Sequence, residues 1–185
     1  MIELTRRKWT LRNVDLLRNS NKTRERSWRN FKGEAGMRNA AGNRNFTIGL
    51  DDETAAEMKA AGWPVRSRPD NRQGHEGEER HTLKVGVKYR TRDGREMKPP
   101  EITVITGKNH VKYGEDQIEA LDFMEFSNVD LILSAYPTVN SFTGEDAVGV
   151  SLSVMFATVE EDEDELTREY NARWDNDEND GELPF

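Results

Sequence analysis

The chain has 185 residues, a length that fits one ordinary domain with appendages, and only 34% of its residues are hydrophobic. It contains no cysteine, which excludes disulfides, thiolate metal ligands and a cysteine nucleophile. No apolar run approaches the roughly 18–20 residues of a membrane span, and the N-terminus lacks the apolar region of a signal peptide. We therefore expect a protein without membrane partners that works in the cytoplasm.

The net charge of −8 conceals an uneven distribution of charge along the chain. Residues 1–112 carry 25 Lys and Arg against 15 Asp and Glu, whereas residues 113–185 carry 2 against 20. An ordinary solvated surface mixes the two signs. The segregation predicts a surface that binds a polyanion and a segment that repels or imitates one.

Aromatic and cationic residues alternate through residues 1–35. Two interpretations remain open. The aromatic side chains face the core of a sheet, or Trp28 and Phe31 stack on bases beside Arg29 and Lys32. Residues 33–45 are rich in Gly and Asn, which predicts a loop carrying Arg38 and Arg44.

A strand followed by a short helix is predicted next. Phe46, Ile48 and Leu50 alternate with period two, which places them on one face of a strand. Asp51 is the expected N-cap of a helix over residues 52–61, with Gly62 past its end. Trp63 is expected to be buried.

Residues 66–80 are expected to form a polar connection. His75 and His81 lie near several glutamates, but without the spacing of a metal site, so no metal is expected. In residues 81–90 the apolar side chains alternate with Lys84, Lys88 and Arg90, which predicts a half-buried strand with a cationic outer row. That row either tracks phosphates, joined by Arg92, or is simply solvated.

A turn at residues 92–95 should return the chain into a strand over residues 101–106. A short helix is predicted over residues 114–123, and the alternation in residues 129–136 and 148–156 predicts a β-hairpin. The loop of that hairpin could direct Tyr136 or Phe142 toward a ligand.

The predicted fold class is mainly β, a partly open antiparallel barrel of the OB-fold type with one or two short helices. Periodicity alone leaves a sandwich open. Residues 1–159 are expected to form the core. Residues 160–185 carry 12 Asp and Glu against two Arg and are expected to form a disordered acidic tail.

Several short motifs resemble bacteriophage single-stranded DNA-binding proteins of the OB-fold class. They are Phe31-Lys32-Gly33, Arg44-Asn45-Phe46, Ala60-Ala61-Gly62-Trp63, and Phe126 to Leu131 leading to Tyr136-Pro137. The terminus Asp180-Gly181-Glu182-Leu183-Pro184-Phe185 is similar to the acidic, Pro-Phe-ending tail of bacterial single-stranded DNA-binding proteins. The resemblance implies that the barrel covers single-stranded DNA and that the tail recruits replication and recombination proteins.

The resulting hypothesis is sequence-independent single-stranded DNA binding, with no enzymatic activity and no cofactor. The expected DNA contacts are Trp28, Arg29, Phe31, Lys32, Arg38, Arg44, Lys84, Lys88, Arg90, Arg92, Tyr136 and Phe142. The expected partner contacts are Asp180, Glu182, Leu183, Pro184 and Phe185. A strand-annealing mediator and an acidic DNA-mimic inhibitor remain alternatives, and the sequence leaves a homo-oligomer open.

Overall fold

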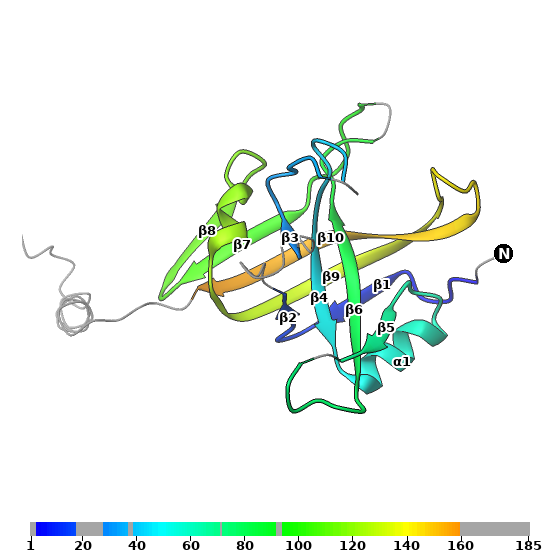
Figure 1. Ribbon diagram of the computed structural model, residues 1–185. Coiled ribbons are helices and arrows are strands. Elements are labelled where there is room, and N and C mark those ends of the chain that lie inside the picture. Colours follow the sequence, from blue (N-terminus) through cyan, green and yellow to red (C-terminus); the bar gives the residue numbers. More distant parts are fainter. Residues whose placement is uncertain (1–2, 18–27, 37–38, 71, 92–93, 160–185) are drawn as a thin grey trace, which may run out of the picture.

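The computed structural model describes residues 3–17, 28–36, 39–70, 72–91 and 94–159 (Figure 1). Arg38, Arg92 and the predicted tail over residues 160–185 lie outside these ranges. Within them the chain forms a ten-stranded sheet, one α-helix and one 3-10 helix. The strands are β1 (Lys8–Leu11), β2 (Asp15–Leu16), β3 (Arg29–Asn30), β4 (Arg44–Leu50), β5 (Arg66–Pro69), β6 (Glu79–Val87), β7 (Glu101–Thr106), β8 (Asn109–Tyr113), β9 (Phe126–Val139) and β10 (Asp146–Val159). The helices are α1 (Asp52–Ala60) and η1 (Ile118–Phe123).

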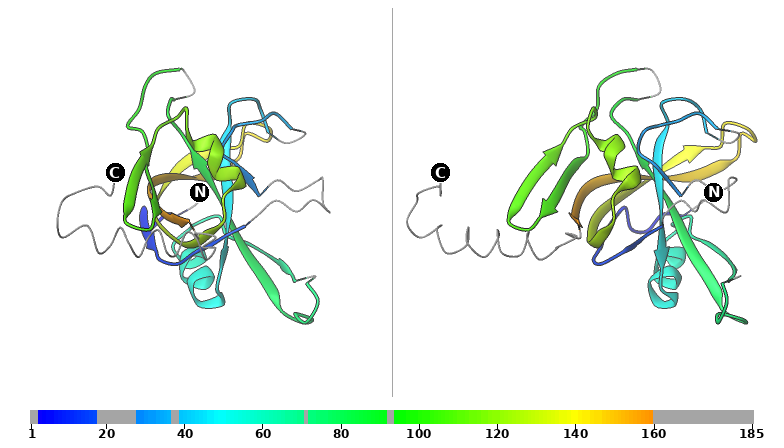
Figure 2. Two further views of the ribbon diagram at one scale, coloured as in Figure 1. Left: turned by 90° about the vertical axis from the view of Figure 1, so that its left-hand side faces the viewer. Right: turned by 60° about the vertical axis from the view of Figure 1, so that its left-hand side comes forward.

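The sheet curls into a partly open barrel. The main strand order is β1-β9-β10-β6-β4-β2, and its two end strands belong to one N-terminal segment. That segment pairs with β9 through β1 and with β4 through β2, and it bends at Asn13, whose φ is 49°. Val14 N–H also donates to the carbonyl of Val129 at 2.9 Å. Viewed end-on, the strands surround the core (Figure 2), which confirms the predicted mainly β, partly open barrel with two short helices.

The core is built from the alternating apolar positions. Leu83, Val85 and Val87 on β6 are at most 3% exposed and face inward. Phe31 and Phe46 are fully buried, with ring centroids 5.1 Å apart. Trp63 is 3% exposed and its ring meets Trp9 edge-on at 5.7 Å, which confirms its predicted burial.

Helix α1 begins at the predicted residue and ends at Ala60, one residue before the predicted end. The Asp51 carboxylate accepts a hydrogen bond from Thr54 N–H at 2.7 Å, and this bond lowers the pKa of Asp51. Gly62 follows the helix with φ 93°, a left-handed conformation that favours glycine. Neither helix of the described ranges has the length or apolar character needed to cross a bilayer.

Two predictions about the connections are wrong, and one strand was missed. Residues 66–80 include β5, a polar strand that pairs with β6. The turn at Gly94 closes only a local bridge between Arg90 and Glu96, and β7 pairs in parallel with β10 instead of returning along β6. The strand β8 also escaped prediction, because four of its five residues are exposed and its two apolar residues, Val111 and Tyr113, make too short an alternation.

Candidate nucleic-acid interface

One surface of the barrel collects the outward-facing residues of four neighbouring strands. Because alternate residues of β6 are buried, Thr82, Lys84 and Gly86 point away from the core. The strand registers place Lys84 opposite Thr47 of β4, and Gly86 opposite Ser151 of β10, which in turn faces Ser134 of β9. We call this surface, made by the outward residues of β4, β6, β10 and β9, the outer face.

Tyr136 and Lys88 meet at one part of the outer face. Tyr136 lies opposite Gly149, and a Cβ on that glycine would stand 2.4 Å from Cζ of the tyrosine ring. The ring therefore lies directly over the backbone of β10. Lys88 Nζ donates to the Tyr136 hydroxyl at 2.7 Å and lies 5.2 Å from the ring centroid. An aromatic ring held beside an exposed cation can stack on a base while the cation contacts a phosphate.

A second group of aromatic and basic residues lies along β4 and β6. Trp28 accepts a backbone hydrogen bond from Thr47 N–H at 2.7 Å, which places it beside β4. The guanidinium of Arg80 lies 5.7 Å from the Trp28 ring centroid. Burial, and then the nearby charge of Arg66, lowers the pKa of Lys84. Cations held this close together favour an anion between them.

Several predicted cations are already paired with acids. Arg90 makes a two-pronged contact with Glu115, at 2.7 and 3.1 Å, and this contact lowers the pKa of Glu115. Arg44 lies 3.7 Å from the same carboxylate and donates to the carbonyl of Phe31 at 2.9 Å. Lys32 lies 3.7 Å from Glu119. The neighbouring acids therefore offset the charge of these three cations.

The predictions for Arg29 and Phe31 are corrected by their burial. Arg29 is 3% exposed, and its guanidinium donates to the carbonyls of Leu16, Leu17 and Met124 at 3.1, 3.1 and 2.7 Å. Phe31 is 0% exposed. Arg29 pairs with Phe46 of β4, so its side chain lies on the inward face, and Phe31, two residues on, points the same way. Both side chains therefore stabilise the barrel.

Phe142 lies at the tip of the β9–β10 hairpin, beyond the outer face. It is 96% exposed. The Asn140 side-chain oxygen accepts hydrogen bonds from the backbone N–H groups of Phe142, at 2.9 Å, and Thr143, at 3.3 Å. The Asn140 side chain thus braces the loop while the aromatic ring meets solvent.

Sequence reasoning missed four residues on or beside the outer face. Lys8 is exposed on β1 opposite Ser134, and Arg66 is exposed on β5 opposite Thr82. Arg80 contacts Trp28, and Gly149 makes room for Tyr136. The alternation of Lys8 with Trp9 is the one sequence signal that could have identified a member of this group; the others depend on cross-strand register.

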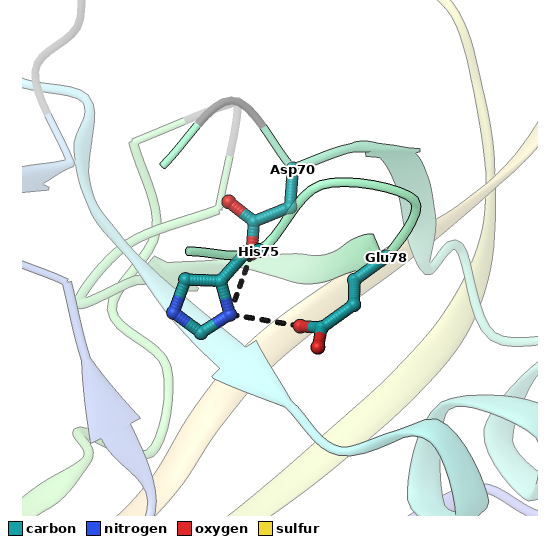
Figure 3. A group of neighbouring side chains, drawn as sticks. All are labelled: Asp70, His75 and Glu78. Atoms are coloured by element: carbon teal, nitrogen blue, oxygen red, sulfur yellow. Dashed lines mark hydrogen bonds and ion pairs between the residues drawn. The ribbon is translucent and has the colours of Figure 1, made fainter. Parts of the chain in front are cut away.

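A cluster of acids and a histidine lies in the turn between β5 and β6 (Figure 3). His75 Nδ1 lies 2.8 Å from Glu78 and 3.9 Å from Asp70. Arg72 holds both oxygens of Asp70, the closest at 2.6 Å, and keeps the pKa of that carboxyl well below its usual range. Asp70 is the most buried acid of the cluster, and the Arg72 guanidinium already pairs with it. These side chains therefore stabilise the turn.

A second polar network ties α1 to the sheet. His81 Nδ1 lies 2.6 Å from the Ser67 hydroxyl, and its Nε2 lies 2.7 Å from Asp52. Lys59 also donates to the Ser67 hydroxyl. The side chain of Asp52 is 91% exposed, so its carboxylate is solvated and lacks the enclosed setting of a catalytic acid. The network joins α1, β5 and β6.

A comparison with protein-family models gives a match. A family model described as "Putative phage ssDNA-binding domain" matches residues 17–182. No curated protein matches the chain.

Among solved structures, two are single-stranded DNA-binding proteins from bacteriophage Enc34. The C-terminally truncated form has a TM-score of 0.44 and 10% identity, covering 84% of this chain and 87% of the other. The complex with ssDNA has a TM-score of 0.46 and 9% identity, covering 84% and 88%.

The gp2.5 protein of bacteriophage T7, a single-stranded DNA-binding protein, has a TM-score of 0.35 and 14% identity, covering 86% of this chain and 95% of its own. These structural likenesses are distant, and the assignment rests on the family model. Since that model spans most of the chain, from the residue after β2 into the acidic tail, the chain belongs to the family of phage ssDNA-binding domains.

Proposed function

We propose that this protein binds and protects single-stranded DNA without sequence preference during phage DNA replication and recombination, in the cytoplasm of the host cell. The observation that carries the proposal is the outer face, where Tyr136 and Trp28 lie beside Lys88 and Arg80. In this account the protein is a binding protein and not an enzyme.

Phosphates and bases would be held by different side chains of the outer face. Lys84, Lys88 and Arg66 are exposed cations that can release counterions from the DNA backbone. Tyr136 and Trp28 offer ring faces, and stacking on a ring contributes about 1–3 kcal/mol per base whatever the base is. Since stacking reads no base edge, this division of roles accounts for binding without sequence preference.

The acidic tail would regulate this binding. The tail, residues 160–185, has a net charge of −10 and follows β10 directly in the chain. Its carboxylates are therefore present at high effective concentration near the cations of the outer face. We propose that it competes with DNA and that DNA binding releases it. The tip formed by Asp180, Glu182, Leu183, Pro184 and Phe185 then recruits replication and recombination proteins.

The binding proposal is tested by fluorescence anisotropy with labelled oligonucleotides of different base composition. We expect similar affinities for all of them, and a large loss when Lys84 and Lys88 are both replaced by Gln. The matched control is the replacement of Lys59 by Gln, which removes a cation from α1. Equal losses in the double variant and in the control would reject the outer face as the DNA site.

The tail proposal has its own test. Deleting residues 160–185 should tighten DNA binding at low salt, where an acidic competitor acts most strongly. Deleting Phe185 alone should leave DNA affinity nearly unchanged and abolish capture of the host or phage replication proteins. Unchanged affinity of the tail-deleted protein at low salt would reject the competition.

A further inference from the structure

We propose that Phe156, together with Lys112, forms a second base-stacking position on the outer face, so that bound DNA continues from the barrel onto the β7–β8 hairpin. The inference rests on the proposed function and extends the site to residues that sequence reasoning did not include. It identifies the ligand of this second position as further nucleotides of the same strand that Tyr136 binds.

Phe156 faces outward from an otherwise buried stretch of β10. It is 44% exposed, whereas its neighbours Met155 and Ala157 are both 0% exposed and point into the core. Its partner on β9 is Asp130. Asp130 and Tyr136 are six positions apart on one strand, so Phe156 and Tyr136 lie on the same face of the β9–β10 hairpin.

A cation lies on the same face across two further strands. Phe156 is in register with Thr103 of β7, and Thr103 is opposite Lys112 of β8. Thr103 is small and only 8% exposed, while Lys112 is exposed. The pairing of an exposed ring with an exposed cation repeats the composition found at Tyr136 and Lys88. The hairpin itself projects from the barrel (Figure 1), which gives the exposed strand β8 a place along the DNA path.

The acid beside Phe156 is engaged elsewhere. The Asp130 carboxylate accepts a hydrogen bond from Asn13 N–H at 2.9 Å, which directs it toward the bend of the N-terminal segment. Its charge therefore opposes a phosphate less than a freely oriented carboxylate would.

Between the two positions the outward residues of β9 and β10 carry no charge, while exposed Lys8 of β1 lies opposite Ser134 and exposed Glu101 of β7 lies opposite Val154. The hydroxyls of Ser134 and Ser153 lie 2.7 Å apart, and the next outward pair is Ile132 with Val154, both partly buried. At about 3.4 Å per residue the six steps from Tyr136 to Asp130 span about 20 Å. This equals about six nucleotides at the 3.4 Å spacing of a stacked strand, within the roughly 4–16 nucleotides bound by one OB-type barrel.

Oligonucleotide length separates the two positions in an experiment on the full chain. We expect Phe156→Ala to weaken binding of a 15-nucleotide oligonucleotide by about 5- to 140-fold, the range that one stacking contact spans, and of a 5-nucleotide one by less than about 2-fold. Phe123→Ala is the matched control, because Phe123 is 81% exposed but lies on η1. It should change neither affinity. Lys112→Gln should lower the salt slope by about 0.7 for the long oligonucleotide alone.

A tryptophan at the same position reports stacking without depending on stability. Phe156→Trp should keep the affinity for the long oligonucleotide and add fluorescence quenching over the parent protein with that length only. Wild-type affinity of Phe156→Ala for both lengths would overturn the inference while leaving the proposed function intact. Equal losses at both lengths, with no added quenching in Phe156→Trp, would also overturn it. Failure of the parent protein to bind either length would instead reject the proposed function.

Discussion

The ring of Tyr136 occupies the space that any side chain at Gly149 would fill. The two residues lie opposite each other on β9 and β10, and a Cβ at position 149 would come within 2.4–2.6 Å of three atoms of the tyrosine side chain. The glycine thus sets the position of the ring, and through the ring the position of the Lys88 amine that bonds to its hydroxyl.

Gly149→Val should displace the Tyr136 ring and weaken single-stranded DNA binding. Valine favours a strand, so the fold should survive, while loss of one stacking platform should cost about 1–3 kcal/mol of binding free energy. Anisotropy titrations and thermal unfolding measure the two effects separately. Gly114→Ala is the control, since its nearest neighbour is the Gln117 side-chain oxygen at 4.0 Å. Full affinity in Gly149→Val would show that the ring position is irrelevant to binding.

Lys88→Gln should remove one phosphate contact. The slope of log affinity against log salt should fall in magnitude by about 0.7, the value for one contact with a single strand. Lys59→Gln, measured over the same salt series, should keep the parent slope. A slope for Lys88→Gln equal to that of the parent would mean that this amine stays in solvent when DNA binds.

Phe31→Ala should act on stability. Its fully buried ring stacks on Phe46, so truncation should lower the free energy of unfolding by about 3–5 kcal/mol in urea titrations. Trp28→Ala, on the outer face, should instead weaken DNA binding at little cost in stability. If Phe31→Ala weakened DNA binding without lowering stability, and Trp28→Ala lowered stability without weakening binding, Phe31 would belong to the DNA site.

Asp122 should make stability depend on pH. Burial raises its pKa above the ordinary value of 3.8, although it accepts hydrogen bonds from the N–H groups of Phe31 and Lys32. The folded state therefore favours the protonated acid, and its contribution to stability is lost as the pH rises from the ordinary value through the raised one.

Asp122→Asn removes this titration. Its free energy of unfolding relative to the parent should rise with pH across that interval, as measured by urea unfolding at a series of pH values. Loss of one hydrogen-bond acceptor adds a constant difference that does not depend on pH. A pH-independent difference between the two proteins would mean that the pKa of Asp122 is the same in the folded and unfolded states.

Patterns in short stretches of sequence correctly predicted several strands and the helix cap. The strand β4, the cap at Asp51 and the β9–β10 hairpin each follow from periodicity or from one capping residue. The same patterns could not choose between the two interpretations of residues 28–31, because aromatic and basic residues alternate there. Only pairing with β4 decides that Trp28 lies beside Thr47 while Arg29 faces the core.

Contacts between distant segments explain the remaining errors. The parallel pairing of β7 with β10 joins residues about 50 positions apart, and no turn signal encodes it. The role of Gly149 in making room for a ring likewise depends on the position of Tyr136 on the neighbouring strand. The predicted DNA contacts at Arg38 and Arg92, and the predicted partner contacts of the tail tip, lie outside the described residues and stay predictions.

A salt titration of single-stranded DNA binding tests the central claim most directly. The full chain and the Lys84→Gln/Lys88→Gln variant are titrated with a labelled 15-nucleotide strand from about 50 mM salt upward. We predict binding that weakens steeply with salt in the parent and a slope smaller in magnitude by about 1.4 in the variant, two phosphate contacts at about 0.7 each. Absence of binding by the parent at about 50 mM salt, or identical slopes in the two proteins, would contradict the account.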